Sequence, residues 1–142
     1  MRYLEITKRL KERTIVSREE QHKLDAQAFY DMMFNRCDPR KAIEKFVGEV
    51  YIQHHPEVAD GKEAFIEYFE RRAVKFPGKK VHIKRVIAEG DLVVLHCHQE
   101  WPGIDDYAGM DIFRFDESGK IVKHWDVLQT IPAKPANYNT IF

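Results

Sequence analysis

The sequence lacks the patterns that several large protein classes require. It has only two cysteines, Cys37 and Cys97, which stand far apart and form no CxxC pair. We therefore expect two free thiols in a reducing compartment, not a disulfide framework. No apolar run approaches the length of a membrane span, and residues 1–8 lack the apolar core of a signal peptide. These absences predict a soluble, cytoplasmic protein without a membrane partner.

An excess of either charge is also missing. Lys plus Arg number 23 and Asp plus Glu number 23, so the formal net charge is zero. Because nucleic-acid binding needs a basic face that displaces counterions, we expect no nucleic-acid partner. There is no Gly-rich phosphate loop and no GxSxG motif, and Cys97 has no obvious basic neighbour that would activate its thiol. Phosphate-loop and thiol or serine nucleophile chemistry are therefore not predicted.

The composition that remains is that of one globular domain. Of 142 residues, 44% are hydrophobic and 12% are aromatic, which is enough for a real core. No repeat, low-complexity tract or linker divides the chain. We therefore predict a single domain over residues 1–142, with an N-terminal arm or helix over 1–16 and an extended tail over 132–142.

Local signals predict helices first and strands afterwards. Ser17 to Glu20 form a capping box that opens a helix to about Arg36, and Asp38-Pro39 opens a short second helix. A third helix follows Asp60-Gly61. Strands are predicted over residues 49–54, 81–89, 92–101, 107–115 and 120–131. This order predicts an α+β fold in which three N-terminal helices pack on the concave face of a curved antiparallel sheet and leave a pocket.

Polar residues on the predicted strands are the candidates for chemistry. Asp111 shares a strand face with Phe113, and Asp126 shares one with His124. A carboxylate on an apolar face is costly to bury unless it is paired or protonated, so both Asp residues are informative. The alternative is that each one caps a neighbouring N–H or sits at the rim of the sheet. His22 and His82 are expected on the solvated surface.

A metal site is a further possibility. His96, His98 and Glu100 alternate on one strand face, as ligands do in metal-binding barrels. Residues two apart on a strand are nearly 7 Å apart at their bases, so a further ligand from another strand, His54 or His124, would be needed. The prediction is that no metal is bound, with the site at His96 and His98 kept as an alternative.

Three sequence segments resemble the SnoaL-like family of polyketide-cyclase-like proteins, in the nuclear transport factor two superfamily. They are Gln53-His54-His55-Pro56 followed by Asp60-Gly61-Lys62-Glu63-Ala64-Phe65, then Met110 to Phe115, then Gly119 to Val127 with its His124-Trp125-Asp126 motif. The resemblance covers residues 18–131. The chain departs from the family at His55, where the first motif often has Asn.

The resemblance implies a cone-shaped α+β barrel that forms a sheet-to-sheet homodimer. Enzymes of this superfamily, such as polyketide cyclases, ketosteroid isomerase and scytalone dehydratase, use pocket Asp and His residues without a metal or organic cofactor. By similarity, Asp126 is the candidate general acid/base, with Asp111 and His54 as candidate partners. Trp125 points the opposite way from Asp126. The candidate substrate-binding residues are Gln53, His55, His96, His98 and His124, over a hydrophobic floor of Phe29, Met33, Phe65 and Phe69.

The hypothesis from the sequence is a pocket protein for a small hydrophobic or carbonyl-containing molecule. Its reaction would be aldol-type cyclisation, isomerisation or dehydration, in which Asp126 moves the proton and Gln53, His54 or a water steadies the oxyanion. The alternatives are a non-catalytic binding module for a hydrophobic metabolite or partner, and the metal site at His96 and His98.

Overall fold

The chain folds as helices followed by strands, as the sequence predicts. The computed structural model describes residues 16–142, so the predicted arm over residues 1–16 falls outside them except for its last residue. The elements in chain order are α2 (Arg18–Tyr30), a π-helical turn η1 (Asp31–Asn35), α3 (Pro39–Phe46), β1 (Val47–Gln53), α4 (Lys62–Lys75), β2 (Lys80–Glu89), β3 (Leu92–Glu100), β4 (Tyr107–Phe115) and β5 (Ile121–Thr130).

Side-chain caps start the first two of these helices, and both were predicted. Ser17 Oγ accepts the backbone N–H of Glu20 at 3.1 Å, and Asp38 Oδ1 accepts that of Lys41 at 3.1 Å. Each cap satisfies an N–H that has no partner within its helix. In contrast, the predicted single helix to Arg36 is wrong at its end. The α-helix stops at Tyr30, and η1 follows, in which the Arg36 N–H donates to the Asp31 carbonyl at 3.0 Å.

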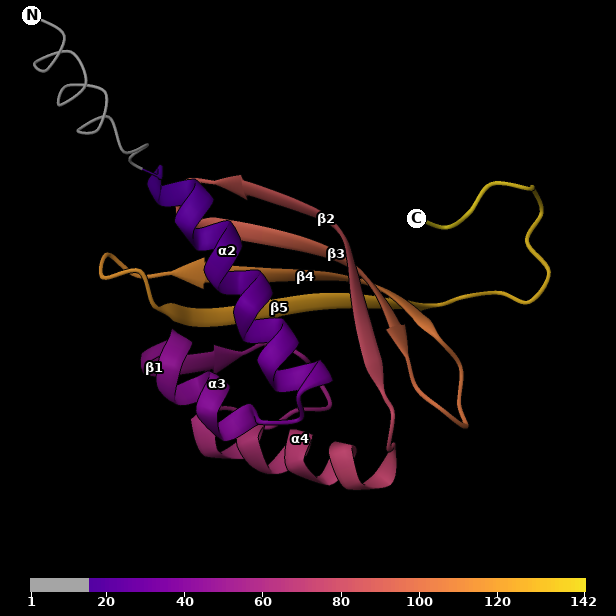
Figure 1. The fold of residues 1–142 in the computed structure, drawn as a ribbon, viewed down its shortest axis with the longest axis horizontal. Helices are drawn as coiled ribbons and strands as arrows, with labels where there is room; N and C mark the ends of the chain where they lie inside the picture. The colour runs from indigo at the N-terminus through magenta and orange to yellow at the C-terminus, as the bar shows by residue number, and fades with distance from the viewer. Residues whose placement is uncertain (1–15) are drawn as a thin grey trace, which may run out of the picture.

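The five strands form one sheet in the order β1-β5-β4-β3-β2 (Figure 1). Neighbours β2 to β5 pair antiparallel, whereas β1 pairs parallel with β5, with Gln53 opposite His124. The prediction of an entirely antiparallel sheet is therefore wrong for this edge. A parallel pair needs a long crossover, and α4 together with β2, β3 and β4 supplies it between β1 and β5.

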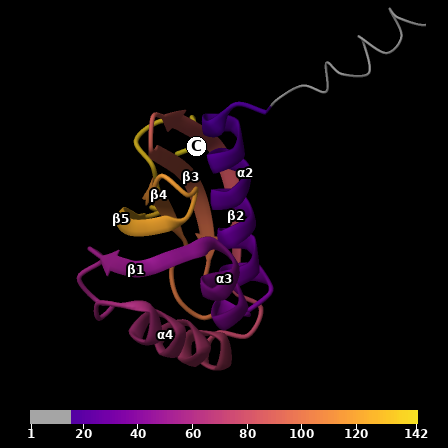
Figure 2. The ribbon, with the colours of Figure 1, turned by 90° about the vertical axis from the view of Figure 1, so that its left-hand side faces the viewer.

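The helices cover one face of the sheet and leave the other without a helix among residues 16–142 (Figure 2). Helix α2 packs on β2 and β3, and α3 and α4 lie beyond it near β1. On β3 the alternation is clear, because Val93, Leu95 and Cys97 are buried while their neighbours are partly exposed. We call the helix-covered side the inner face and the opposite side the outer face. Each described helix is too short or too polar to span a lipid bilayer.

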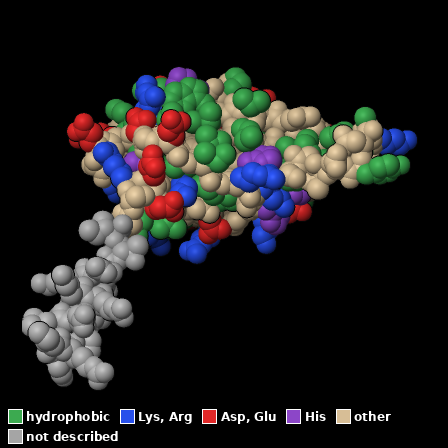
Figure 3. Space-filling model, turned by 90° about the horizontal axis from the view of Figure 1, so that it is seen from above, with side chains coloured by type: hydrophobic (Ala, Val, Ile, Leu, Met, Phe, Trp, Pro, Cys, Tyr) green, Lys and Arg blue, Asp and Glu red, His purple; other side chains and the backbone are tan. Residues whose placement is uncertain are grey.

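The C-terminal segment over residues 132–142 carries no helix or strand and is largely exposed. It turns back so that the ring of Phe142 lies on the outer face, 5.0 Å from the His98 ring and 5.4 Å from the His96 ring between centroids. Figure 3 shows histidine and basic side chains grouped on the surface beside this protruding segment. The last residue therefore returns to β3, although the segment before it does not pack on the sheet.

The outer face carries an apolar strip across the strands. It consists of Ile87, Val94, Met110, Ile112, Trp125 and Val127, which neighbour one another in the strand register. Ile87 is 60% exposed, Met110 47% and Val127 72%. Exposed apolar faces of antiparallel sheets mark sites that a second molecule covers.

We therefore predict a homodimer in which two outer faces pack together. Static light scattering at micromolar concentration should give twice the mass of the chain. Val127→Glu, which places a charge in the apolar strip, should shift the mass to that of a monomer. The matched control is Val74→Glu, because Val74 is 85% exposed on α4, away from the sheet. A monomeric wild type, or equal effects of the two variants, would contradict this interface.

The inner face rests on an aromatic core whose members differ in burial. Phe65 of α4 is 1% exposed and packs on Phe29, Tyr51 and Phe69, whereas Phe69 is only partly buried. Phe65→Ala should therefore lower the free energy of unfolding by about 3–5 kcal/mol, and Phe69→Ala by clearly less. Urea denaturation measures both values. Equal losses would show that Phe69 is as deeply packed as Phe65.

Candidate active site

A cavity of about 360 Å³ lies between the inner face of the sheet and helices α2 and α4. This volume lies within the range of small-molecule sites. Its walls are mostly aromatic and apolar: Phe29, Tyr30, Met33, Phe34, Tyr51, Phe65, Tyr68, Phe69, Trp101, Ile104, Tyr107, Phe113 and Leu128. Gln53, His55, Glu57, Arg72, Gln99, Asp111, His124 and Asp126 contribute polar groups. The cavity is thus an apolar container with few, concentrated polar contacts.

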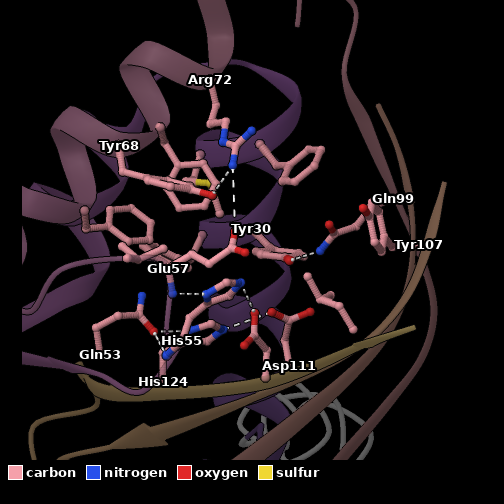
Figure 4. A pocket seen from close by; sticks show the side chains of 18 of the residues that line it. Tyr30, Gln53, His55, Glu57, Tyr68, Arg72, Gln99, Tyr107, Asp111 and His124 are labelled. Atoms are coloured by element: carbon pink, nitrogen blue, oxygen red, sulfur yellow. Dashed lines mark hydrogen bonds and ion pairs between the residues drawn. The ribbon is translucent and has the colours of Figure 1, made fainter. Parts of the chain in front are cut away.

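A row of hydrogen bonds runs along the bottom of the cavity from β1 to β4 (Figure 4). His124 on β5 contacts Gln53 Oε1 through Nδ1 at 2.8 Å and Asp111 Oδ1 through Nε2 at 2.9 Å. The row exists because β5 pairs with both neighbours, so that Gln53 lies opposite His124 on one side and Asp111 lies on β4 on the other. The parallel edge strand is therefore what brings Gln53 to the site.

The proton positions in this row follow from one backbone contact. The N–H of His55 donates to Gln53 Oε1 at 3.0 Å, which identifies that atom as the amide oxygen. His124 Nδ1 must then carry a proton, because it faces an acceptor. His124 Nε2 faces the Asp111 carboxylate, so this one imidazole links Gln53 on β1 to Asp111 on β4.

Asp111 is the most enclosed polar group of the site. It is 1% exposed, and its Oδ2 atom has no hydrogen-bond partner among the described residues. Gly109, two residues earlier on β4, leaves the space beside it, since a Cβ there would lie 3.4 Å from Asp111 Oδ2 and 3.0 Å from Leu128 Cδ2. An unsatisfied buried oxygen is costly, so this atom is available for a group that enters the cavity.

Asp126 lies directly opposite Asp111 in the register of β4 and β5. Its Oδ2 is 3.6 Å from His55 Nε2, and its side chain is 7% exposed. Burial raises the pKa of Asp126; the neighbouring His124 lowers it, Asp111 raises it and His55 lowers it by smaller amounts. His55 Nδ1 accepts the Glu57 N–H at 3.1 Å, so the Nε2 proton of His55 faces Asp126. The site therefore holds two separate carboxylate–imidazole pairs.

A second chain of hydrogen bonds crosses the roof of the cavity. The indole N–H of Trp101 donates to Gln99 Oε1 at 3.1 Å, and Gln99 Nε2 then donates to the Tyr30 hydroxyl at 2.9 Å. Because Tyr30 accepts here, its own proton points away from Gln99, and the Asp111 side chain is within hydrogen-bonding reach of it. Burial raises the pKa of Tyr30 well above its usual range, and the charge of Asp111 raises it further. Tyr30 is thus a neutral hydrogen-bond donor at any physiological pH.

Arg72 on α4 lies across the cavity from Asp111 (Figure 4). Its guanidinium donates to the Tyr68 hydroxyl at 2.8 Å, lies over the Trp101 ring at 5.6 Å, and is 4.0 Å from Glu57 Oε2. Arg72, Tyr30 and Gln99 are site residues that were not predicted from the sequence. Helical spacing from Phe65 to Phe69 and Phe76 could have placed Arg72 near this face, but no motif distinguishes it from the other charges of α4.

The structure brings together most of the predicted site residues. Nine of them line the cavity: Phe29, Met33, Gln53, His55, Phe65, Phe69, Asp111, His124 and Asp126. The expectation that His54, His96 and His98 face the pocket is wrong. His54 stacks on Trp125 at 4.8 Å, and His96 and His98 alternate with the buried residues of β3, so all three lie on the outer face. Asp126 is therefore paired with His55, and His54 takes no part.

His22 and His82 differ from each other in environment. His22, expected at the surface, is 2% exposed and stacks on Phe115 with ring centroids 4.2 Å apart, so that prediction is wrong. His22 lies on the same face of α2 as the buried residues Ala26 and Phe29, so its side chain points into the core. His82 remains partly exposed on β2, where it contacts Glu100.

One group of cavity side chains has donor atoms close enough together to be considered as metal ligands. Donor atoms of Asp111, His124 and Asp126 lie within 4.8 Å of one another. Asp111 and His124 share the 2.9 Å hydrogen bond described above, and both are buried with the other His124 nitrogen held by Gln53, so their side chains have no room to turn towards an ion. Their arrangement is that of proton-sharing groups, and it suits acid/base chemistry better than ligation.

A family model for the SnoaL-like domain matches residues 26–124, well over half of the chain. The chain belongs to this SnoaL-like family. The match includes every cavity carboxylate and histidine except Asp126, which follows two residues after its end. No curated protein matches the sequence.

Solved structures show the fold of this SnoaL-like chain in other proteins. TsrD from Streptomyces laurentii is 21% identical with a TM-score of 0.61, over 75% of this chain and 89% of that one. A candidate polyketide cyclase from Bacillus cereus is 19% identical with a TM-score of 0.66, over 77% and 74%. A candidate SnoaL-like polyketide cyclase from Jannaschia is 18% identical with a TM-score of 0.64, over 82% and 90%. At these identities the likeness shows the cone-shaped α+β fold of the superfamily, which the sequence analysis predicted.

The raised pKa of Asp126 predicts how stability depends on pH. The folded chain binds this proton more tightly than the unfolded chain, so wild-type stability falls as pH rises from about 4 through the raised pKa. Asp126→Asn lacks this loss. Its Tm relative to wild type should therefore increase between pH 4 and pH 8 in thermal unfolding followed by circular dichroism. A Tm difference that stays constant across this range would contradict the raised pKa. The control is Asp105→Asn, which makes the same substitution at an exposed residue.

Proposed function

We propose that this SnoaL-like chain is a cofactor-free acid/base catalyst that acts on a small carbonyl-containing molecule. The observation that carries the proposal is the pair of neighbouring carboxylates, Asp111 and Asp126, each matched with its own imidazole at the bottom of an aromatic cavity. A buried carboxylate whose pKa is raised, placed in a cavity with specific polar partners, is typical of a site for acid/base chemistry.

In the proposed mechanism Asp126 moves the proton. Its pKa is raised towards the working pH, so it can take a proton from the carbon next to a carbonyl and return it at another position. His55 Nε2–H faces Asp126 and stabilises its ionised form once the proton has been taken. The Asp111–His124–Gln53 row fixes the position of Asp111 beside the reacting carboxylate.

The oxygen of the substrate needs a hydrogen-bond donor as negative charge develops on it. His54, one of the donors considered from the sequence, lies on the outer face, and the Gln53 Nε2 group donates to the Tyr51 hydroxyl at 3.5 Å. We assign this role to the Tyr30 hydroxyl, which lines the cavity and keeps its proton. The reaction class would be aldol-type cyclisation, isomerisation or dehydration, all of which pass through an enol or enolate.

The similar structures support this class. Two of those compared above are described as candidate polyketide cyclases, and a candidate isomerase of the SnoaL-like family from Agrobacterium tumefaciens is 20% identical with a TM-score of 0.61. Cyclases and isomerases of this kind share proton transfer at a carbon next to a carbonyl. The aromatic walls favour a flat, conjugated or cyclic substrate over a highly charged one.

The test uses deuterium exchange, which needs no knowledge of the natural product. A panel of cyclic and β-dicarbonyl compounds is incubated with the protein in D₂O, and NMR follows deuterium incorporation next to the carbonyl. Wild type should accelerate exchange for at least one compound. Asp126→Asn should reduce that rate by about two to four orders of magnitude, the usual contribution of a general acid/base, with ligand affinity within about tenfold.

Asp105→Asn is the matched control, because this substitution makes the same chemical change at an exposed loop residue. Its exchange rate should equal that of wild type. If Asp126→Asn exchanged as fast as wild type, Asp126 would not be the proton carrier. Tight binding of a panel member without any accelerated exchange would favour the alternative of a non-catalytic binding module.

A further inference from the structure

Two histidine–carboxylate pairs lie close together on the outer face, away from the cavity. His82 Nε2 on β2 is 2.6 Å from Glu100 Oε2 on β3. His98 Nε2 on β3 is 2.9 Å from Asp106 Oδ2, in the loop that joins β3 to β4. All four side chains are partly exposed. Neither pair belongs to the row of hydrogen bonds in the cavity.

The sheet register brings these two pairs together. His82 and His98 are directly opposite each other on β2 and β3, and their ring centroids are 5.6 Å apart. Donor atoms of His98, Glu100 and Asp106 all lie within 4.8 Å of one another. Three donor atoms, from His98, Glu100 and Asp106, therefore surround one point on the surface, and His82 lies beside it through its 2.6 Å contact with Glu100.

We propose that His82, His98, Glu100 and Asp106 form a binding site for a divalent transition-metal ion, with Zn²⁺ as the best-fitting ion. Imidazole nitrogen and carboxylate oxygen bind zinc at about 2.0–2.2 Å, and four such ligands satisfy its tetrahedral preference. A set with two nitrogen donors disfavours Mg²⁺ and Ca²⁺, which prefer oxygen ligands throughout. The partial exposure of the four side chains allows the small rotations that would bring their donor atoms to one ion.

This set differs from the one that the sequence suggested. His96 lies on the same strand face as His98, but its Nδ1 is 3.0 Å from the Arg85 guanidinium. The positive charge of Arg85 at this distance would repel a metal ion at His96. His82 takes the place of His96, because cross-strand pairing puts it opposite His98.

An ion at this site would restrain a loop whose residues line the cavity. Asp106 ends the β3–β4 loop, and Ile104 of that loop and Trp101 at its start line the cavity. Ligation of Asp106 together with His98 and Glu100 would fasten the loop to β3. The loop would then exchange its amide hydrogens more slowly, since exchange there needs local opening.

The experiment uses the full chain without an affinity tag and measures zinc binding by isothermal titration calorimetry. We expect one Zn²⁺ per chain and no heat with Mg²⁺. His98→Ala and Asp106→Asn should each weaken zinc binding by at least about tenfold. His96→Ala is the matched control on the same strand face, and Asp126→Asn removes a carboxylate from the cavity group; both should bind zinc like wild type. Asp106 is a loop residue, so Asp106→Asn decides the question if His98→Ala fails to fold.

Hydrogen exchange with mass spectrometry supplies a second readout. Zinc should slow exchange in peptides that cover residues 101–107, and it should have no such effect in Asp106→Asn. The proposal is overturned by three results: no zinc binding to wild type, a loss of binding in Asp126→Asn that Asp106→Asn does not share, or one ion per two chains. The second result would move the site into the cavity, and the third would make it a bridge between copies.

Discussion

The site depends on one constraint: two carboxylates lie side by side on neighbouring strands with little access to water. Asp111 and Asp126 are register partners on β4 and β5, so the sheet itself fixes their separation. Two adjacent negative charges would be costly in this environment, and each carboxylate is therefore matched with an imidazole from a different element. Three further features support this arrangement. They are the position of β1, the turn at Gln53 and His55, and the space beside Asp111 left by Gly109.

Backbone amides and indole N–H groups determine where the protons lie. Each can only donate, so the His55 N–H identifies the oxygen of Gln53, and the Trp101 N–H identifies that of Gln99. From those two atoms it follows that His124 Nδ1 donates to Gln53 and that Tyr30 accepts from Gln99. Rigid groups of the scaffold thus set the direction of these hydrogen bonds before any ligand enters.

The fold could be predicted from local signals, and the site only in part. Caps at Ser17 and Asp38, and two-residue alternation in the strands, gave the order of the elements. The direction of β1 depends on pairing with β5 far along the chain, which no local pattern encodes. For β3, apolar residues occupy both faces, so the alternation alone could not decide whether Val93 and Leu95 or His96 and His98 face inward. Arg72 has no signal beyond helical spacing.

The position of Arg72 makes the electrostatic potential differ between the two ends of the cavity. One end holds a guanidinium that is only loosely neutralised by Glu57 at 4.0 Å. The other end holds the Asp111–His124 hydrogen bond and an Asp126 that becomes negative on losing its proton. The field along this axis is felt strongly because the walls between its ends are aromatic and exclude water. A ligand with a dipole is therefore oriented in the cavity, with its electron-rich end towards α4 and its acidic C–H end towards β5.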